Sequence, residues 1–134
     1  MNLDAPPAGA RAGRLAPARV VLVDDHDLIR AGLSAALTSE PDIRICGEAA
    51  DGASGAEVAL SRRPDVVLMD IQMPGVGGIA ATQKIVASWP QARVVVLTAF
   101  SDVRLVRDAL AAGAWGYVLK DADPSTVITA VRMA

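Results

Sequence analysis

In this 134-residue chain, Asp70 is the residue whose type and position most clearly suggest chemistry. It closes an apolar run over residues 66–69, which follows Pro64 and precedes the turn-forming pair Pro74 and Gly75. A short run that begins with β-branched residues and is bounded in this way predicts a strand buried on both faces. Such a strand ends in a charge only where it reaches the rim of a sheet, which is where ligands bind in open parallel sheets. Asp70 is therefore predicted to be a site residue.

The same pattern, a buried strand closed by a polar residue, occurs at three other places. The closing residues are Asp24 together with Asp25, Thr98 and Lys120. Crossover connections in a parallel sheet bring the carboxyl ends of all strands to one rim. We therefore expect these side chains to lie near Asp70, close to the topological switch point of the sheet.

Three carboxylates at one rim repel each other and need a counter-charge. At ~5 Å and an effective dielectric constant of ~20, each pair costs about 3 kcal/mol. Protonation or a bound cation relieves this repulsion, and a hard divalent ion with oxygen ligands, such as Mg²⁺, suits the site. Mg²⁺ and Lys120 together balance the three negative charges. The neutral site can then accept a phosphoryl group, with its oxygens shared among the metal, the Lys120 ammonium and the Thr98 hydroxyl.

Along the chain, segments with the hydrophobic pattern of a strand alternate with segments that have the pattern of a helix. Strands are expected at residues 19–25, 43–49, 64–70, 93–98 and 115–120, and helices at about 28–37, 52–63, 79–88, 102–110 and after Pro124. The strand at 43–49 alternates apolar and polar residues, which is typical of a sheet edge. Five strands alternating with five helices predict an α/β fold, with a parallel sheet, right-handed crossovers and helices on both faces.

The chain is predicted to form one domain after a short leader. Residues 1–17 are rich in Pro, Gly and Ala without periodicity and are expected to be disordered, whereas residues 18–134 can form one core. A net charge of −2 offers no basic surface for nucleic acid. The single cysteine, Cys46, fits a reducing compartment, and no apolar run approaches the ~20 residues needed to cross a bilayer. We expect a cytoplasmic protein that does not bind membranes.

Four motifs in fixed order give the chain a resemblance to a known family. They are Val-Asp-Asp-His at 23–26, Leu-Met-Asp-Ile-Gln-Met-Pro-Gly at 68–75, Leu-Thr-Ala at 97–99 and Tyr-Val-Leu-Lys-Asp at 117–121. From residue 19 onward the chain resembles the receiver domain of two-component response regulators, with the closest likeness to the NarL/FixJ subfamily. The resemblance implies a flavodoxin-like fold with strand order 2-1-3-4-5, and phosphoryl transfer from a sensor histidine kinase to Asp70.

The resemblance also implies roles for the other site residues. Asp24 and Asp25 would hold Mg²⁺ together with Asp70 and the backbone carbonyl of Gln72. Lys120 would pair with the phosphoryl group, Thr98 would bond it, and Tyr117 would be the aromatic switch. Phosphorylation is expected to favour a homodimer through a face that includes Trp115. Members of this subfamily usually continue into a LuxR-type helix-turn-helix domain, so DNA binding and transcriptional regulation are expected to reside in an output domain outside residues 1–134.

Other interpretations of the same residues stay open at this point. A haloacid-dehalogenase-type hydrolase also uses an aspartyl phosphate, Mg²⁺, Thr and Lys, and residues 25–27 imitate its D-x-D signature. A stand-alone receiver that acts by protein contact is another candidate. We expect a phosphoacceptor that is labelled once, and not an enzyme. His26 has no evident partner and is expected at the surface or at a helix start. Gly77 stands before Gly78 where the family often carries Asp or Asn, so the next helix is expected to start raggedly.

Overall fold

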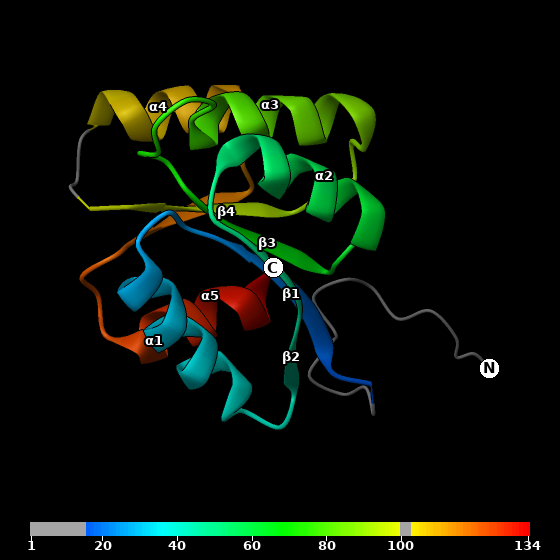
Figure 1. Ribbon diagram of the computed structural model, residues 1–134, viewed down its shortest axis with the longest axis vertical. Coiled ribbons are helices and arrows are strands. Elements are labelled where there is room, and N and C mark those ends of the chain that lie inside the picture. Colours follow the sequence, from blue (N-terminus) through cyan, green and yellow to red (C-terminus); the bar gives the residue numbers. More distant parts are fainter. Residues whose placement is uncertain (1–15, 100–102) are drawn as a thin grey trace.

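The fold is a five-stranded parallel sheet covered by helices on both faces, as the computed structural model shows for residues 16–99 and 103–134 (Figure 1). The strands are β1 (Ala18–Val23), β2 (Ile43–Ala49), β3 (Val66–Asp70), β4 (Val94–Thr98) and β5 (Gly116–Leu119). The helices are α1 (Asp27–Thr38), α2 (Gly52–Arg62), α3 (Gly78–Ser88), α4 (Val103–Ala111) and α5 (Pro124–Met133).

The strand order is β2-β1-β3-β4-β5, and every neighbouring pair is parallel. This confirms the doubly wound architecture expected from the sequence. Every residue of β3 and β4 is buried, because both strands lie inside the sheet with helices over each face. The order reverses between β1 and β3, so the carboxyl ends of these two strands flank the switch point, where α/β proteins bind ligands.

Alternate residues of the strands feed two separate hydrophobic layers. Val21, Met69 and Val96 pack on the side of α2, α3 and α4, whereas Leu22 and Leu68 pack on the side of α1 and α5 (Figure 1). This is the period of two that a strand buried on both faces requires. The two layers hold the central strands rigidly and thereby position the residues at their ends.

Several strand boundaries differ slightly from the sequence prediction. The first strand was expected to run through Asp25 but ends at Val23, so both aspartates follow it. The last strand was expected at 115–120 but is β5, so Trp115 and Lys120 flank the strand instead of belonging to it. The predicted start of the fourth helix at Asp102 lies outside the described residues, as do positions 1–15 of the predicted leader. The expected proline at the start of the last helix is confirmed, with Pro124 in its first turn.

Gly78 brings the start of α3 into direct contact with the backbone of Asp70. Its amide donates a hydrogen bond of 2.9 Å to the carbonyl of Ile71. A Cβ atom at this position would lie 1.9 Å from the Asp70 carbonyl oxygen. The preceding residue, Gly77, is the N-cap residue of α3 and provides no side-chain hydrogen bond. Gly78 therefore permits a close approach of α3 to the site strand that a residue with a Cβ atom would prevent.

We predict that Gly78→Ala lowers the free energy of unfolding by more than 2 kcal/mol, on the order expected when a buried overlap forces the backbone to move. The matched control is Gly32→Ala, in the exposed face of α1, where a Cβ meets nothing within 4 Å. This control should gain up to about 1 kcal/mol, because Ala is the better helix former. Urea unfolding measures both variants, and equal stabilities would contradict the close packing at Gly78.

Candidate functional site

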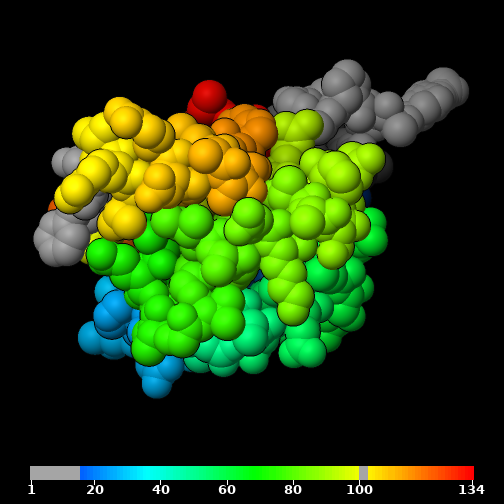
Figure 2. Space-filling model, turned by 90° about the horizontal axis from the view of Figure 1, so that it is seen from above, coloured from blue at the N-terminus to red at the C-terminus, as the bar shows by residue number. Residues whose placement is uncertain are grey.

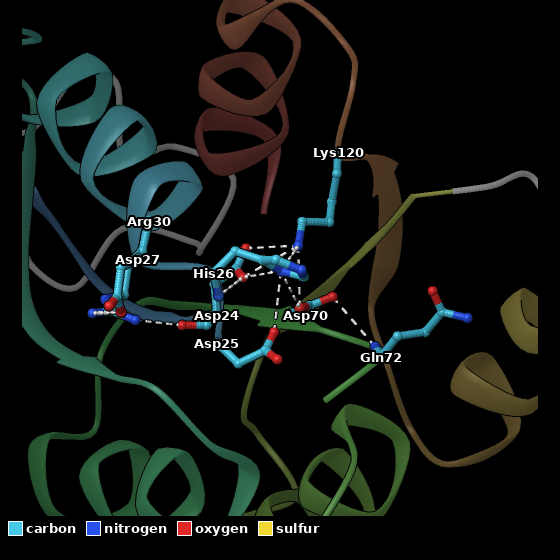
Figure 3. A network of polar contacts seen from close by, with 8 residues as sticks. All are labelled: Asp24, Asp25, His26, Asp27, Arg30, Asp70, Gln72 and Lys120. Carbon is cyan, nitrogen blue, oxygen red and sulfur yellow. Dashed lines mark hydrogen bonds and ion pairs between the residues drawn. The ribbon is translucent and has the colours of Figure 1, made fainter. Parts of the chain in front are cut away.

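Three carboxylates meet at the carboxyl ends of β1 and β3 (Figure 3). Asp24 directly follows β1 and is fully buried, and its amide donates to the carbonyl of Ala49 at 3.1 Å. Asp70 is the last residue of β3 and is 1% exposed. Asp25 is half-buried beside them. The predicted meeting of these three residues at the rim is therefore what the structure shows.

Lys120 reaches the carboxylates from the end of the edge strand β5. It follows β5, where its amide donates to the carbonyl of Thr98 at 2.7 Å. Its Nζ lies 3.0 Å from Asp24 Oδ2 and 3.1 Å from Asp70 Oδ2 (Figure 3). One ammonium thus bridges the carboxylates of two neighbouring strands, and the buried pair of acids keeps a compensating charge.

His26 is exposed and is the N-cap residue of α1, as the sequence predicted, but its ring also belongs to this cluster, which was not predicted. Its Nδ1 lies 3.1 Å from Asp25 Oδ1, 3.2 Å from Asp24 Oδ1 and 3.8 Å from Asp70 Oδ2. The same nitrogen is 3.1 Å from Lys120 Nζ. The signal was present in the sequence, because a residue directly after two rim aspartates shares their rim.

The remaining predicted site residues lie at different distances from the cluster. The backbone amide of Gln72 donates to Asp70 Oδ1 at 3.3 Å, and the Gln72 side chain extends away from the acids (Figure 3). Thr98 is buried at the end of β4, next to β3. Tyr117 lies in the edge strand β5 with half of its surface exposed, outside the acidic cluster. The roles of these three residues stay predictions.

Arg30 is a second residue that the sequence did not indicate. Its Nη1 donates to the backbone carbonyl of Asp24 at 2.6 Å, and its other guanidinium nitrogens contact Asp27 at 2.9 Å and Glu48 at 3.4 Å. The guanidinium thus ties the first turn of α1 and the end of β2 to the backbone of Asp24. No pattern in the sequence predicts a contact between a side chain and a particular carbonyl.

The cluster carries an electrostatic cost that a cation would remove. Burial, together with the charge of Asp24, raises the pKa of Asp70 to about 6, although the Lys120 ammonium opposes the shift. Among the described residues, the buried oxygens Asp24 Oδ2 and Asp25 Oδ1 make no hydrogen bond. One ligand atom from each of Asp24, Asp25, His26 and Asp70 lies within 4.8 Å of the others. Closely spaced oxygens of this kind fit a divalent cation.

We predict that Asp70→Asn stabilises the metal-free protein above pH 6. The pKa of Asp70 is about 6 in the folded protein and has the ordinary value of 3.8 in the unfolded chain. Between pH 3.8 and pH 6, Asp70 is therefore protonated more in the folded state than in the unfolded state, and the free energy of unfolding falls as the pH rises through this range. The gain at pH 7.5 should be about 1–2 kcal/mol after solvent screening, and it should vanish near pH 4. Urea unfolding in EDTA at both pH values measures it, and a pH-independent difference would exclude this origin.

Comparisons with known proteins agree with this geometry. The family model for the response regulator receiver domain matches residues 20–132. The transcriptional regulatory protein LiaR of Bacillus subtilis is 42% identical over 116 residues, which are 87% of this chain and 55% of LiaR. The response regulator UvrY of Escherichia coli is 41% identical over 113 residues, covering 84% of this chain and 52% of UvrY. The chain thus spans about half the length of the curated relatives it matches.

Solved structures show the same fold. The signal receiver domain of the putative response regulator NarL from Mycobacterium tuberculosis matches with a TM-score of 0.82 and 37% identity, covering 87% of this chain and 94% of that one. A LuxR-family two-component response regulator from Aurantimonas has a TM-score of 0.82 at 35% identity, covering 87% of this chain and 83% of that one. Among the described residues, no helix is long and apolar enough to span a membrane. This chain belongs to the response regulator receiver domain family, with relatives of the LuxR and NarL type.

Proposed function

We propose that Asp70 accepts a phosphoryl group from a sensor histidine kinase and that this modification switches an output. The observation that carries the proposal is the environment of Asp70. It is a nearly buried carboxylate at the end of a central strand, with the Lys120 ammonium 3.1 Å from Oδ2. A carboxylate held at a rim beside a fixed positive charge is suited to act as a nucleophile toward an anionic group.

The acidic residues fit a bound Mg²⁺. Asp24, Asp25, Asp70 and the backbone carbonyl of Gln72 would hold the ion, because hard oxygen ligands are what Mg²⁺ prefers. The two buried oxygens without hydrogen bonds, Asp24 Oδ2 and Asp25 Oδ1, support this assignment. The bound ion would supply positive charge that lets a phosphodonor approach three carboxylates.

The residues of the chain itself perform the transfer. An Asp70 oxygen supplies the electron pair that forms the new O–P bond, while the bond from phosphorus to the kinase imidazole nitrogen breaks and that nitrogen keeps its electron pair. Lys120, only 6% exposed in its side chain, orients a phosphoryl oxygen by a charge-assisted hydrogen bond. The hydroxyl of Thr98, buried at the end of the neighbouring strand β4, donates to another phosphoryl oxygen.

The response to phosphorylation runs through β4 and β5. Movement of the Thr98 side chain toward the phosphoryl group leaves space behind β4, and Tyr117, half-exposed on the adjoining strand β5, is the ring placed to fill it. Its burial reshapes the face formed by α4, β5 and α5. These elements carry the exposed apolar side chains Leu110, Tyr117 and Met133, and Trp115, also exposed, directly precedes β5. Such residues are typical of interfaces, so phosphorylation would favour a homodimer through this face.

In the whole protein the output would be transcriptional regulation. LiaR is named as a transcriptional regulatory protein, and this chain covers only 55% of it. A DNA-binding domain outside residues 1–134 would therefore carry the contact with DNA, while this domain carries the switch. We further propose that the protein works in the cytoplasm and that the phosphoryl group is a signal on Asp70, not an intermediate of an enzyme that turns over a substrate.

Incubation with acetyl phosphate and Mg²⁺ tests the phosphoacceptor. We expect the mass of the intact wild type to increase by one phosphoryl group, and Asp70→Asn to gain none, because an amide cannot act as this nucleophile. Asp108→Asn, an exposed aspartate of α4, is the matched control and should be labelled like the wild type. Labelling of Asp70→Asn, or labelling of the wild type at full rate in EDTA, would refute the proposal.

Sedimentation of the same samples reports the switch. The labelled wild type should associate more strongly than the unlabelled protein, whereas labelled Thr98→Ala and Trp115→Ala should associate less. If both variants respond like the wild type, the dimer forms through another face.

A further inference from the structure

We propose that His26 is a nitrogen ligand of the cation site and gives it a preference for late first-row divalent ions, such as Zn²⁺, Co²⁺ or Ni²⁺, that oxygen ligands alone would not give. The inference rests on the cation site of the proposed function and adds a residue and a metal class to it. Imidazole nitrogen is a favourable ligand for these ions, whereas Mg²⁺ prefers oxygen.

The position of the His26 ring fits a ligand in the same coordination sphere as the acids. With metal–ligand bonds of about 2.1 Å, neighbouring ligand atoms of one ion lie about 3.0–3.4 Å apart, and opposite ones about 4.2 Å. His26 Nδ1 lies 3.1 Å from Asp25 Oδ1 and 3.2 Å from Asp24 Oδ1. The distance from His26 Nδ1 to Asp70 Oδ2 is 3.8 Å, which lies between the separation of neighbouring ligands and that of opposite ligands. Figure 3 shows the ring among the three carboxylates.

The contact with Lys120 shows how the ring can present a lone pair. Lys120 Nζ lies 3.1 Å from His26 Nδ1. An ammonium has no lone pair, so in this contact it donates and Nδ1 accepts. In the tautomer that carries its proton on Nε2, Nδ1 has an electron pair directed toward the cluster. This is the tautomer that a metal ligand at Nδ1 requires. Asp24 Oδ1 and Asp25 Oδ1, at 3.2 and 3.1 Å from Nδ1, are also acceptors, so a cation between these atoms would remove their mutual repulsion.

The backbone of His26 is held in place by a hydrogen bond, while its ring contacts Asp24, Asp25 and Lys120. The His26 amide donates to Asp24 Oδ1 at 2.9 Å, which fixes the turn between β1 and α1. His26 is also the N-cap residue of α1, yet its side chain makes no capping hydrogen bond. The side chain is 57% exposed, so the ring can adjust toward an ion without disturbing the core.

The second observation that points to a cation is the state of the carboxylate oxygens. Asp25 Oδ1, the atom 3.1 Å from the imidazole nitrogen, is buried and has no hydrogen bond, and the same is true of Asp24 Oδ2. Lys120 provides an ion pair to Asp24 Oδ2 at 3.0 Å. An ion held between Asp24, Asp25 and His26 would give the Asp25 oxygen the partner that it lacks within the described part of the chain.

Calorimetric titration of the full chain without an affinity tag, with Co²⁺ and separately with Mg²⁺, tests the proposal. We expect His26→Gln to lose about tenfold or more in Co²⁺ affinity and to keep its Mg²⁺ affinity within about twofold. Asp25→Asn should weaken both ions, and Asp108→Asn neither. Unfolding curves of each variant establish that it is folded before titration.

The chain contains one histidine, so proton NMR of the Co²⁺-loaded protein gives an unambiguous second reading. A single exchangeable imidazole proton, shifted far outside the usual range by the paramagnetic ion, is expected in the wild type and absent from His26→Gln. Unchanged Co²⁺ affinity in His26→Gln, an equal loss for both ions, or the absence of the shifted proton would overturn the role of His26. The proposed function would survive if Mg²⁺ still bound, whereas a wild type that binds neither ion would overturn both.

Discussion

The site depends on the repulsion between the carboxylates of Asp24 and Asp70, which the ammonium of Lys120 holds close to each other. Two buried carboxylates on adjacent strands share one ammonium, and a third, Asp25, stands beside them without a cation of its own within hydrogen-bond distance in the described chain. Burial, and next the charge of Asp24, raises the pKa of Asp70 to about 6 although Lys120 opposes the shift. A site poised in this way responds strongly to anything that changes its charge, such as a divalent cation or a phosphoryl group.

The rest of the fold keeps this unfavourable arrangement from relaxing. The strands that carry the acids are buried on both faces between two hydrophobic layers, one on each side of the sheet. Gly78 allows α3 to press against the carbonyl of Asp70, and Arg30 holds the carbonyl of Asp24. Figure 2 shows the outer surface of the side on which α3 and α4 lie, and buried side chains of both helices pack against the sheet beneath. The burial of apolar surface thus stabilises a cluster that would be unstable alone.

Much of this arrangement follows from the sequence, because strand periodicity and strand ends are local signals. The runs before Asp24, Asp70, Thr98 and Lys120 indicated both the parallel sheet and the rim at which these residues lie. The part that could not be predicted depends on side-chain direction across the sheet. His26 lies at the surface and at the start of α1, as expected, but the direction of its ring toward the acids was not predictable, and neither was the contact of the Arg30 guanidinium with one particular carbonyl. Gly77 and Gly78 looked like a poor helix start, and the close contact with Asp70 explains Gly78.

The most direct test of the account is the position of a cation in a crystal grown with Mn²⁺, located by anomalous scattering at the manganese edge. We expect one strong peak about 2.2 Å from oxygens of Asp24, Asp25 and Asp70. The absence of a peak at this rim, or a peak bound only to residues elsewhere, would contradict the proposed cation site.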